Sequence, residues 1–154
     1  NARTNGIQID GNNGTATEQG VIANVGMIGA NTNGISVGND NNGTILSHGY
    51  ADHAVGITAT VSGIAVGNDN NGSISNNAYS TLEVASTGIS VGNDNNGTVA
   101  NAGRISRFGL GSSTTGIRVS GSNAGTIANS GTVQASYTGI YVGNGSDKCL
   151  RKGF

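Results

Sequence analysis

The chain has 154 residues and a formal net charge of −1, with 28 Gly, no Pro, no Trp, 10% charged and 4% aromatic residues. This length suits one domain, and the scarcity of large apolar side chains argues against an ordinary globular core. The near-neutral charge, without a Lys/Arg cluster, argues against nucleic acid and acidic membrane surfaces as partners. No apolar run reaches the roughly 20 residues of a membrane helix, so we expect no membrane insertion of this segment. Disorder is disfavoured because Ile and Val recur at fixed offsets.

The chain is built from an internal repeat. GISVGNDNNGT occurs at 34–44 and again at 88–98, and GIAVGNDNNGS occurs at 63–73. Repeats aligned on a Gly-Ile pair have a period of about 27 residues, and they start at Gly6, Gly34, Gly63, Gly88, Gly116 and Gly139. A period of this length predicts a solenoid.

Each repeat carries three short apolar segments in the same order. The first is the Ile-x-Val or Ile-x-Ile alternation that begins with the Ile of the Gly-Ile start. The second begins at a Gly-Thr or Gly-Ser pair, and we assign Gly14-Thr15 as this pair in the first repeat. The third lies six residues before the next start, at Ile28, Ile57, Leu82 and Val133. Apolar residues spaced by two predict short strands. Ile105 breaks the third spacing, so we expect an inserted loop of about five residues in RFGLGSSTT at 107–115.

The predicted fold is all-β: a right-handed parallel β-helix, or β-solenoid, of about five coils of ~27 residues. Equivalent strands then pair in parallel about 4.8 Å apart, and two interior columns form: Ile35, Ile64, Ile89, Ile117 and Ile140, and Val37, Val66, Val91, Val119 and Val142. We expect residues 1–145 to be the solenoid domain, cut from a longer chain. Residues 146–154 (SDKCLRKGF) abandon the repeat, as a polar cap, a junction to another segment or an added sequence.

The repeated corner places acids at equivalent positions, Asp40, Asp69 and Asp94. Either these carboxylates point into the solvent and Asp serves only as a turn residue, or they share a calcium ion with nearby Asn side chains and carbonyls. The corner lacks the Gly-Gly-x-Gly-x-Asp rhythm of calcium-binding β-rolls, so the solvent account is favoured. No cofactor is expected, because the Gly-rich corners are not followed by the helix that a phosphate loop requires.

Five Asn-Gly-Ser/Thr triplets are candidate glycosylation sites, at Asn13, Asn42, Asn71, Asn96 and Asn144. The alternative, which we favour, is that Asn-Gly is simply good corner chemistry and Thr is a good strand residue. Thr44, Ser73, Thr98 and Thr126 form a hydroxyl column of the kind that ice-binding solenoids present. Its neighbour reads Leu46, Ser75, Ala100 and Ala128 and weakens that alternative.

Catalytic residues are not predicted. The chain has eight carboxylates and two histidines, and its aromatic residues do not cluster with acids as they do in sugar-cleaving clefts. His48, Asp52 and His53 form the one grouping that could bind a metal or orient a general base, and an exposed loop with incidental histidines is the favoured interpretation. Cys149 stands alone and has no partner for an internal disulfide.

The segment GTIANSGTVQASYTGIYV, at 125–142, resembles the repeats of bacterial autotransporter passengers and haemagglutinin-like surface adhesins. The resemblance implies a right-handed parallel β-helix, exported and displayed at the bacterial surface. We therefore expect a structural or adhesive, non-catalytic segment whose partners are host-surface or glycan ligands or neighbouring β-helical segments, with end-to-end or lateral self-association. The alternatives are a carbohydrate-active β-helix, such as a polysaccharide lyase or phage tailspike, and an ice-binding solenoid.

Overall fold

The computed structural model describes residues 4–51, 55–109, 113–144 and 151–152, which form strands and no helix. Sheet 1 consists of β1 (Ile7–Ile9), β4 (Asn33–Val37), β7 (Ser62–Val66), β10 (Thr87–Val91), β13 (Thr115–Val119) and β16 (Thr138–Val142). Sheet 2 consists of β2 (Val21–Asn24), β5 (Thr44–Ser47), β8 (Ser73–Asn76), β11 (Thr98–Asn101), β14 (Thr126–Asn129) and β17 (Arg151–Lys152). Sheet 3 consists of β3 (Met27–Ala30), β6 (Val55–Ala59), β9 (Ser80–Val84), β12 (Arg104–Arg107) and β15 (Thr132–Gln134).

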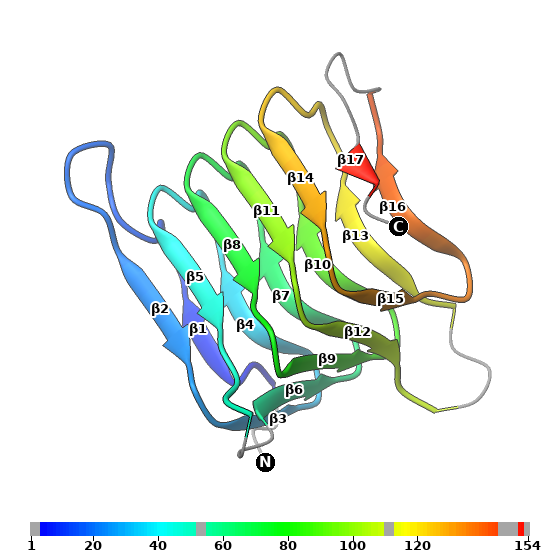
Figure 1. Cartoon of the computed structure of the whole chain (residues 1–154). Coiled ribbons are helices and arrows are strands. Elements are labelled where there is room, and N and C mark those ends of the chain that lie inside the picture. Colours follow the sequence, from blue (N-terminus) through cyan, green and yellow to red (C-terminus); the bar gives the residue numbers. More distant parts are fainter. Residues whose placement is uncertain (1–3, 52–54, 110–112, 145–150, 153–154) are drawn as a thin grey trace.

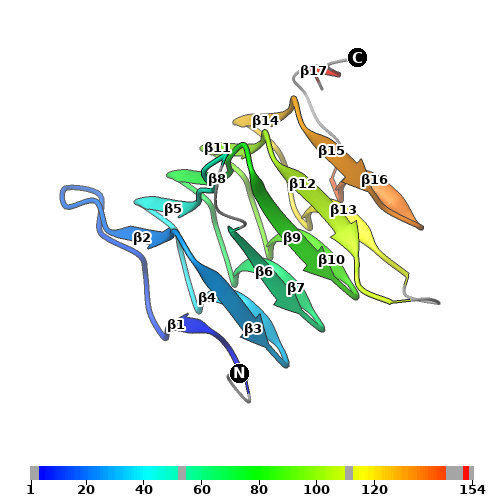
Figure 2. The ribbon, with the colours of Figure 1, turned by 60° about the horizontal axis from the view of Figure 1, so that its bottom comes forward.

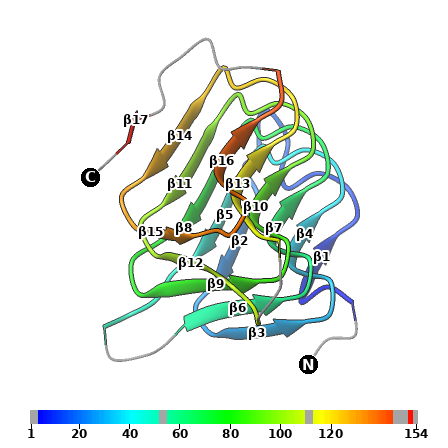
Figure 3. The ribbon, with the colours of Figure 1, turned by 90° about the vertical axis from the view of Figure 1, so that its right-hand side faces the viewer.

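These sheets form the walls of a parallel solenoid, and Figures 1 and 2 show the successive strands of each sheet side by side along its axis. Seen from the C-terminal end, the chain runs counter-clockwise as it approaches the viewer, so the solenoid is right-handed (Figure 3). The predicted fold class is confirmed. The solenoid has about four turns, slightly fewer than the expected five.

The two predicted interior columns of sheet 1 are confirmed. Ile35 pairs with Ile64, and the register carries on to Ile89, Ile117 and Ile140. Val91 occupies the same place in the second column, between Val66 and Val119, and is fully buried. The narrow interior is therefore filled by β-branched side chains that stack on their own equivalents.

The third column confirms the repeat and locates the insertion. Ile28, Ile57, Leu82, Ile105 and Val133 pair in one register through sheet 3. Ile105 therefore keeps its place, and the extra residues lie after β12, between Arg107 and Thr115. Residues 110–112 of this segment lie outside the described residues.

In every coil but the last, the glycine that precedes the interior Ile is required by close packing. A Cβ at Gly34 would collide with the Cγ2 atom of Ile57, and one at Gly88 would lie 2.5 Å from the Cγ2 atom of Ile105. Sheet 1 can therefore approach the sheet 3 column only if this position has no side chain. The Gly-Ile pair thus marks the contact between two walls of the solenoid.

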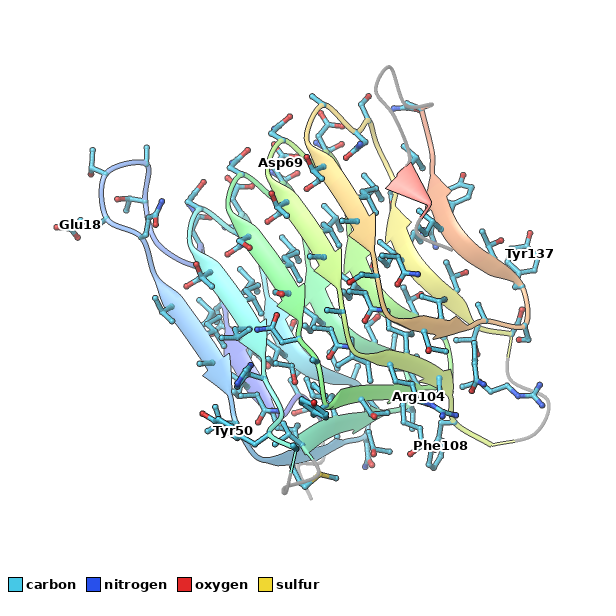
Figure 4. All side chains as sticks on the ribbon, viewed as in Figure 1. Glu18, Tyr50, Asp69, Arg104, Phe108 and Tyr137 are labelled. Atoms are coloured by element: carbon cyan, nitrogen blue, oxygen red, sulfur yellow. The ribbon has the colours of Figure 1, made fainter. Side chains whose placement is uncertain are left out.

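One predicted equivalence is wrong. Gly14-Thr15 does not start the second strand of the first coil; β2 begins at Val21, which pairs with Thr44. Gly14 has a φ of 79°, and the backbone N–H of Thr15 donates to the Glu18 carbonyl oxygen at 2.7 Å. The residues after Gly14 therefore form a turn that projects from the solenoid, with Glu18 on its outer side (Figure 4).

Candidate functional site

The corner between sheets 1 and 2 holds a buried asparagine ladder. The Nδ2 atom of each Asn donates to the Oδ1 atom of the next, over distances of 2.6–2.8 Å, through Asn13, Asn41, Asn70, Asn95 and Asn123. These side chains are 0–5% exposed. The sequence analysis missed this ladder, although an Asn at the same place in every corner, including SGSNAG at 120–125, could have indicated it.

A second ladder lies at the end of sheet 2. Asn76 donates to Asn101, and Asn101 donates to Asn129, both at 2.7 Å. Toward the N-terminus the same row continues with Ser47, whose hydroxyl is 2.7 Å from that of Ser80. Both ladders bind successive coils through buried amides and hydroxyls, which stabilise the stack when each has a partner. The Oδ1 atom of Asn76 is the exception in the second ladder, because it is buried and accepts no hydrogen bond.

The corner acids are bound to the neighbouring coil. The Oδ1 atom of Asp40 accepts hydrogen bonds from Asn68 Nδ2 at 2.7 Å and from the Asp69 backbone N–H at 3.2 Å. Asp69 accepts from Asn93 and Asp94 in the same way, at 2.8 and 3.0 Å, and Asp94 accepts from the Ser122 N–H. Figure 4 places Asp69 on the outer ridge of the solenoid. One oxygen of each carboxylate therefore holds the next coil rather than simply facing water.

The candidate glycosylation sites fall into two rows. Asn13 belongs to the buried ladder and is 5% exposed, so its amide is inaccessible in the folded chain. Asn42, Asn71 and Asn96 lie one residue further along the corner, on its outer side, where Asn71 donates to Asn42 and Asn96 donates to Asn71, each at 3.0 Å. Asn144 is exposed, whereas the rest of its triplet lies outside the described residues.

The histidine grouping is described only in part. His48 Nδ1 lies 3.2 Å from Asn77 Nδ2, and the His48 ring meets the Tyr50 ring edge-on at 4.8 Å between centroids. Asp52, His53 and Cys149 lie outside the described residues. Within the described part of the chain, no three His, Cys, Asp or Glu side chains come together as metal ligands would.

The outer face of sheet 2 has the predicted hydroxyl column. Thr44, Ser73, Thr98 and Thr126 are in register, and Val21 occupies the equivalent place in the first coil. The neighbouring column is also in register and is mainly apolar: Ala23, Leu46, Ser75, Ala100 and Ala128. This face therefore presents one row of hydroxyls beside one row of small or apolar groups.

Tyrosine and arginine side chains gather on the outer face of sheet 1 near its C-terminal end. The guanidinium carbon of Arg118 lies 5.7 Å from the Tyr141 ring centroid, and the two residues pair across β13 and β16. A surface cavity of about 240 Å³ is lined by Thr115, Arg118, Tyr137, Thr138 and Tyr141. We call these five residues the Tyr137 cluster. No signal for this cluster arises when the aromatic residues of the sequence are compared with its acids, because the charged residue of the cluster is Arg118.

The fold and these surfaces define the chain as a parallel β-solenoid repeat protein in which rows of Asn and Asp side chains bind one coil to the next. No protein-family model, curated protein or solved structure matches the chain. The part of the chain that the structure describes contains no helix that could span a bilayer.

Proposed function

We propose that the chain is a structural and adhesive rod segment of a secreted or surface-displayed bacterial protein, without catalytic activity. The observation that carries the proposal is the continuous stack, in which each sheet is hydrogen-bonded from coil to coil along the whole solenoid. Such a stack holds its lateral surface rigid and can project binding side chains away from a cell. The resemblance of residues 125–142 to autotransporter passenger repeats supports display at the bacterial outer surface.

The arrangement of the repeated corner acids favours this proposal over a carbohydrate-active enzyme. Glycoside hydrolysis uses two carboxyl groups on opposite sides of the scissile bond. Asp40, Asp69 and Asp94 instead form a single row on one ridge, and each gives one oxygen to the next coil. Incubation with a polysaccharide panel should release neither reducing ends nor unsaturated products, and sustained release would overturn the non-catalytic part of the proposal.

Adhesion is tested with beads that carry the purified chain. We expect beads with the wild-type chain to be retained on host-cell monolayers, and beads with the Val91→Asp variant to be washed off. Val91 is fully buried, so an unpaired carboxylate there should unfold the stack. Antibodies against the chain should also label intact bacteria that produce it. Labelling only after lysis, together with equal retention of both bead types, would contradict the proposal.

A further inference from the structure

The Tyr137 cluster has the composition of a small ligand site rather than of a structural contact. Tyr137 is 77% exposed and Tyr141 is 43% exposed, and Figure 4 shows Tyr137 pointing away from the solenoid. Half of the four tyrosines in the chain therefore lie together at the surface. Exposed aromatic rings offer an apolar face and a polar hydroxyl in a rigid side chain, which suits them to binding.

Arg118 supplies an available positive charge in this cluster. Its guanidinium contacts the Tyr141 ring, and it forms no ion pair with any carboxylate among the described residues. None of the residues that line the cavity is acidic. The planar guanidinium can bind a carboxylate through two parallel hydrogen bonds, and its stacking on a ring keeps it in place for such a contact.

The column of residues that leads to the cluster has small side chains in its middle coils. Along the outer face of sheet 1, the column that ends in Arg118 and Tyr141 passes through Ser36, Ala65 and Ser90. The cavity also has two hydroxyl side chains in register, Thr115 and Thr138. An extended ligand with hydroxyls of its own can therefore lie along this column and reach the guanidinium.

We propose that the Tyr137 cluster binds an acidic glycan, with the carboxylate of a uronic acid residue on Arg118 and the apolar face of a sugar ring on Tyr137 or Tyr141. The threonine hydroxyls would then bond to sugar hydroxyls. This inference rests on the proposed adhesive function, because it names the class of ligand that the rod would bind. It concerns one defined site and is tested apart from adhesion itself.

The test is a titration of the isotope-labelled chain with a galacturonic acid tetrasaccharide, followed by amide chemical shifts. We expect shifts confined to residues 115–119 and 137–142. Arg118→Ala and Tyr141→Ala should each weaken binding at least about tenfold, the loss expected for one charge-assisted or stacked contact. The matched controls are Arg107→Ala and Tyr79→Ala, which change exposed residues elsewhere and should bind as the wild type does.

Several results would overturn the assignment. These are shifts spread over the corners, unchanged affinity in Arg118→Ala with an unaltered melting temperature, or equal binding of the methyl-esterified tetrasaccharide. Equal binding of an acidic tetrapeptide at the same residues would assign the cluster to protein partners instead. Bead retention separates the two proposals: if the Arg118→Ala beads still adhere and no glycan binds, the glycan site fails while the adhesive function stands. If the glycan binds at the cluster but wild-type beads do not adhere, the adhesive function fails while the glycan site stands.

Discussion

Buried asparagines at the corners bind each coil to the next with side-chain amides, so single substitutions there have consequences across two coils. Asn70 accepts a hydrogen bond from Asn41 at 2.7 Å and donates one to Asn95 at 2.7 Å. Asn70→Ala removes both bonds and leaves a buried donor and a buried acceptor with poorer partners. We expect the free energy of unfolding to fall by about 2–4 kcal/mol, because two buried polar groups, the Asn41 amide donor and the Asn95 amide acceptor, each lose a hydrogen bond.

The adjacent residue provides the control for this prediction. Asn71 is exposed and bonds to Asn42 at 3.0 Å on the outer side of the same corner. Asn71→Ala should change the free energy of unfolding by no more than about 0.5 kcal/mol, as is usual for surface substitutions. Urea unfolding followed by circular dichroism measures both variants. Equal losses in the two would mean that burial does not distinguish the inner row from the outer row.

The contact between sheets 1 and 3 depends on the glycine of each Gly-Ile pair. A Cβ at Gly88 would lie 2.5 Å from Gly116 O and from Ile105 Cγ2. Gly88→Ala therefore forces two walls of the solenoid apart, and we expect it to cost about 1–3 kcal/mol. Gly139 has the same place in the last Gly-Ile pair, but a Cβ there meets no heavy atom within 4 Å. Gly139→Ala should be neutral in thermal unfolding, and a loss as large as that of Gly88→Ala would show that strand geometry rather than contact sets the requirement.

The corner acids already hold hydrogen-bond donors where a calcium ion would have to bind. Calcium takes six to eight oxygen ligands, whereas the Oδ1 atoms of Asp40 and Asp69 each accept two N–H donors from the next coil. These donors would repel a cation at the same oxygens. Millimolar calcium should therefore leave the melting temperature unchanged relative to magnesium. A rise of several degrees that Asp69→Asn abolishes would instead show a metal bound along this ridge.

The sequence predicts the elements of this fold well because each interior column repeats one residue type at one spacing. Alternation around Ile89 and Val91 reports burial directly, since a strand turns every second side chain inward. The start of β2 could not be predicted in the same way, because Gly14-Thr15 imitates the pair that starts the equivalent strands, and only pairing of Val21 with Thr44 reveals the inserted turn. Part of the Tyr137 cluster was within reach, since the predicted columns of Ile117 with Ile140 and Val119 with Val142 already place Arg118 beside Tyr141. The position of Tyr137, which precedes β16, does not follow from these columns.

In the molecule as a whole, successive coils contact mainly their neighbours, so stability should be close to a sum of coil and interface contributions. The apolar columns of sheet 1 keep one register from β1 to β16, and the first asparagine ladder joins five successive corners. Removing one whole repeat should therefore join equivalent positions. Deletion of residues 63–87 brings Ser62 to Gly88, places Asn95 over Asn41 and stacks Ile89 on Ile35, in the same pattern that now links neighbouring coils.

We expect this shortened chain to fold, with the same strand signal per residue in circular dichroism and a lower melting temperature, because one coil and one interface are lost. The matched control deletes residues 63–76, which removes β7 after Ser62 and all of β8 from that coil but leaves its sheet 3 strand, β9. In that variant β9 would follow directly on β6, and Leu82 could no longer stack on Ile57. The control should therefore unfold at much lower temperature than the whole-repeat deletion. If both deletions lost structure equally, cooperativity would extend over the entire solenoid, and the coil would not be its unit of folding.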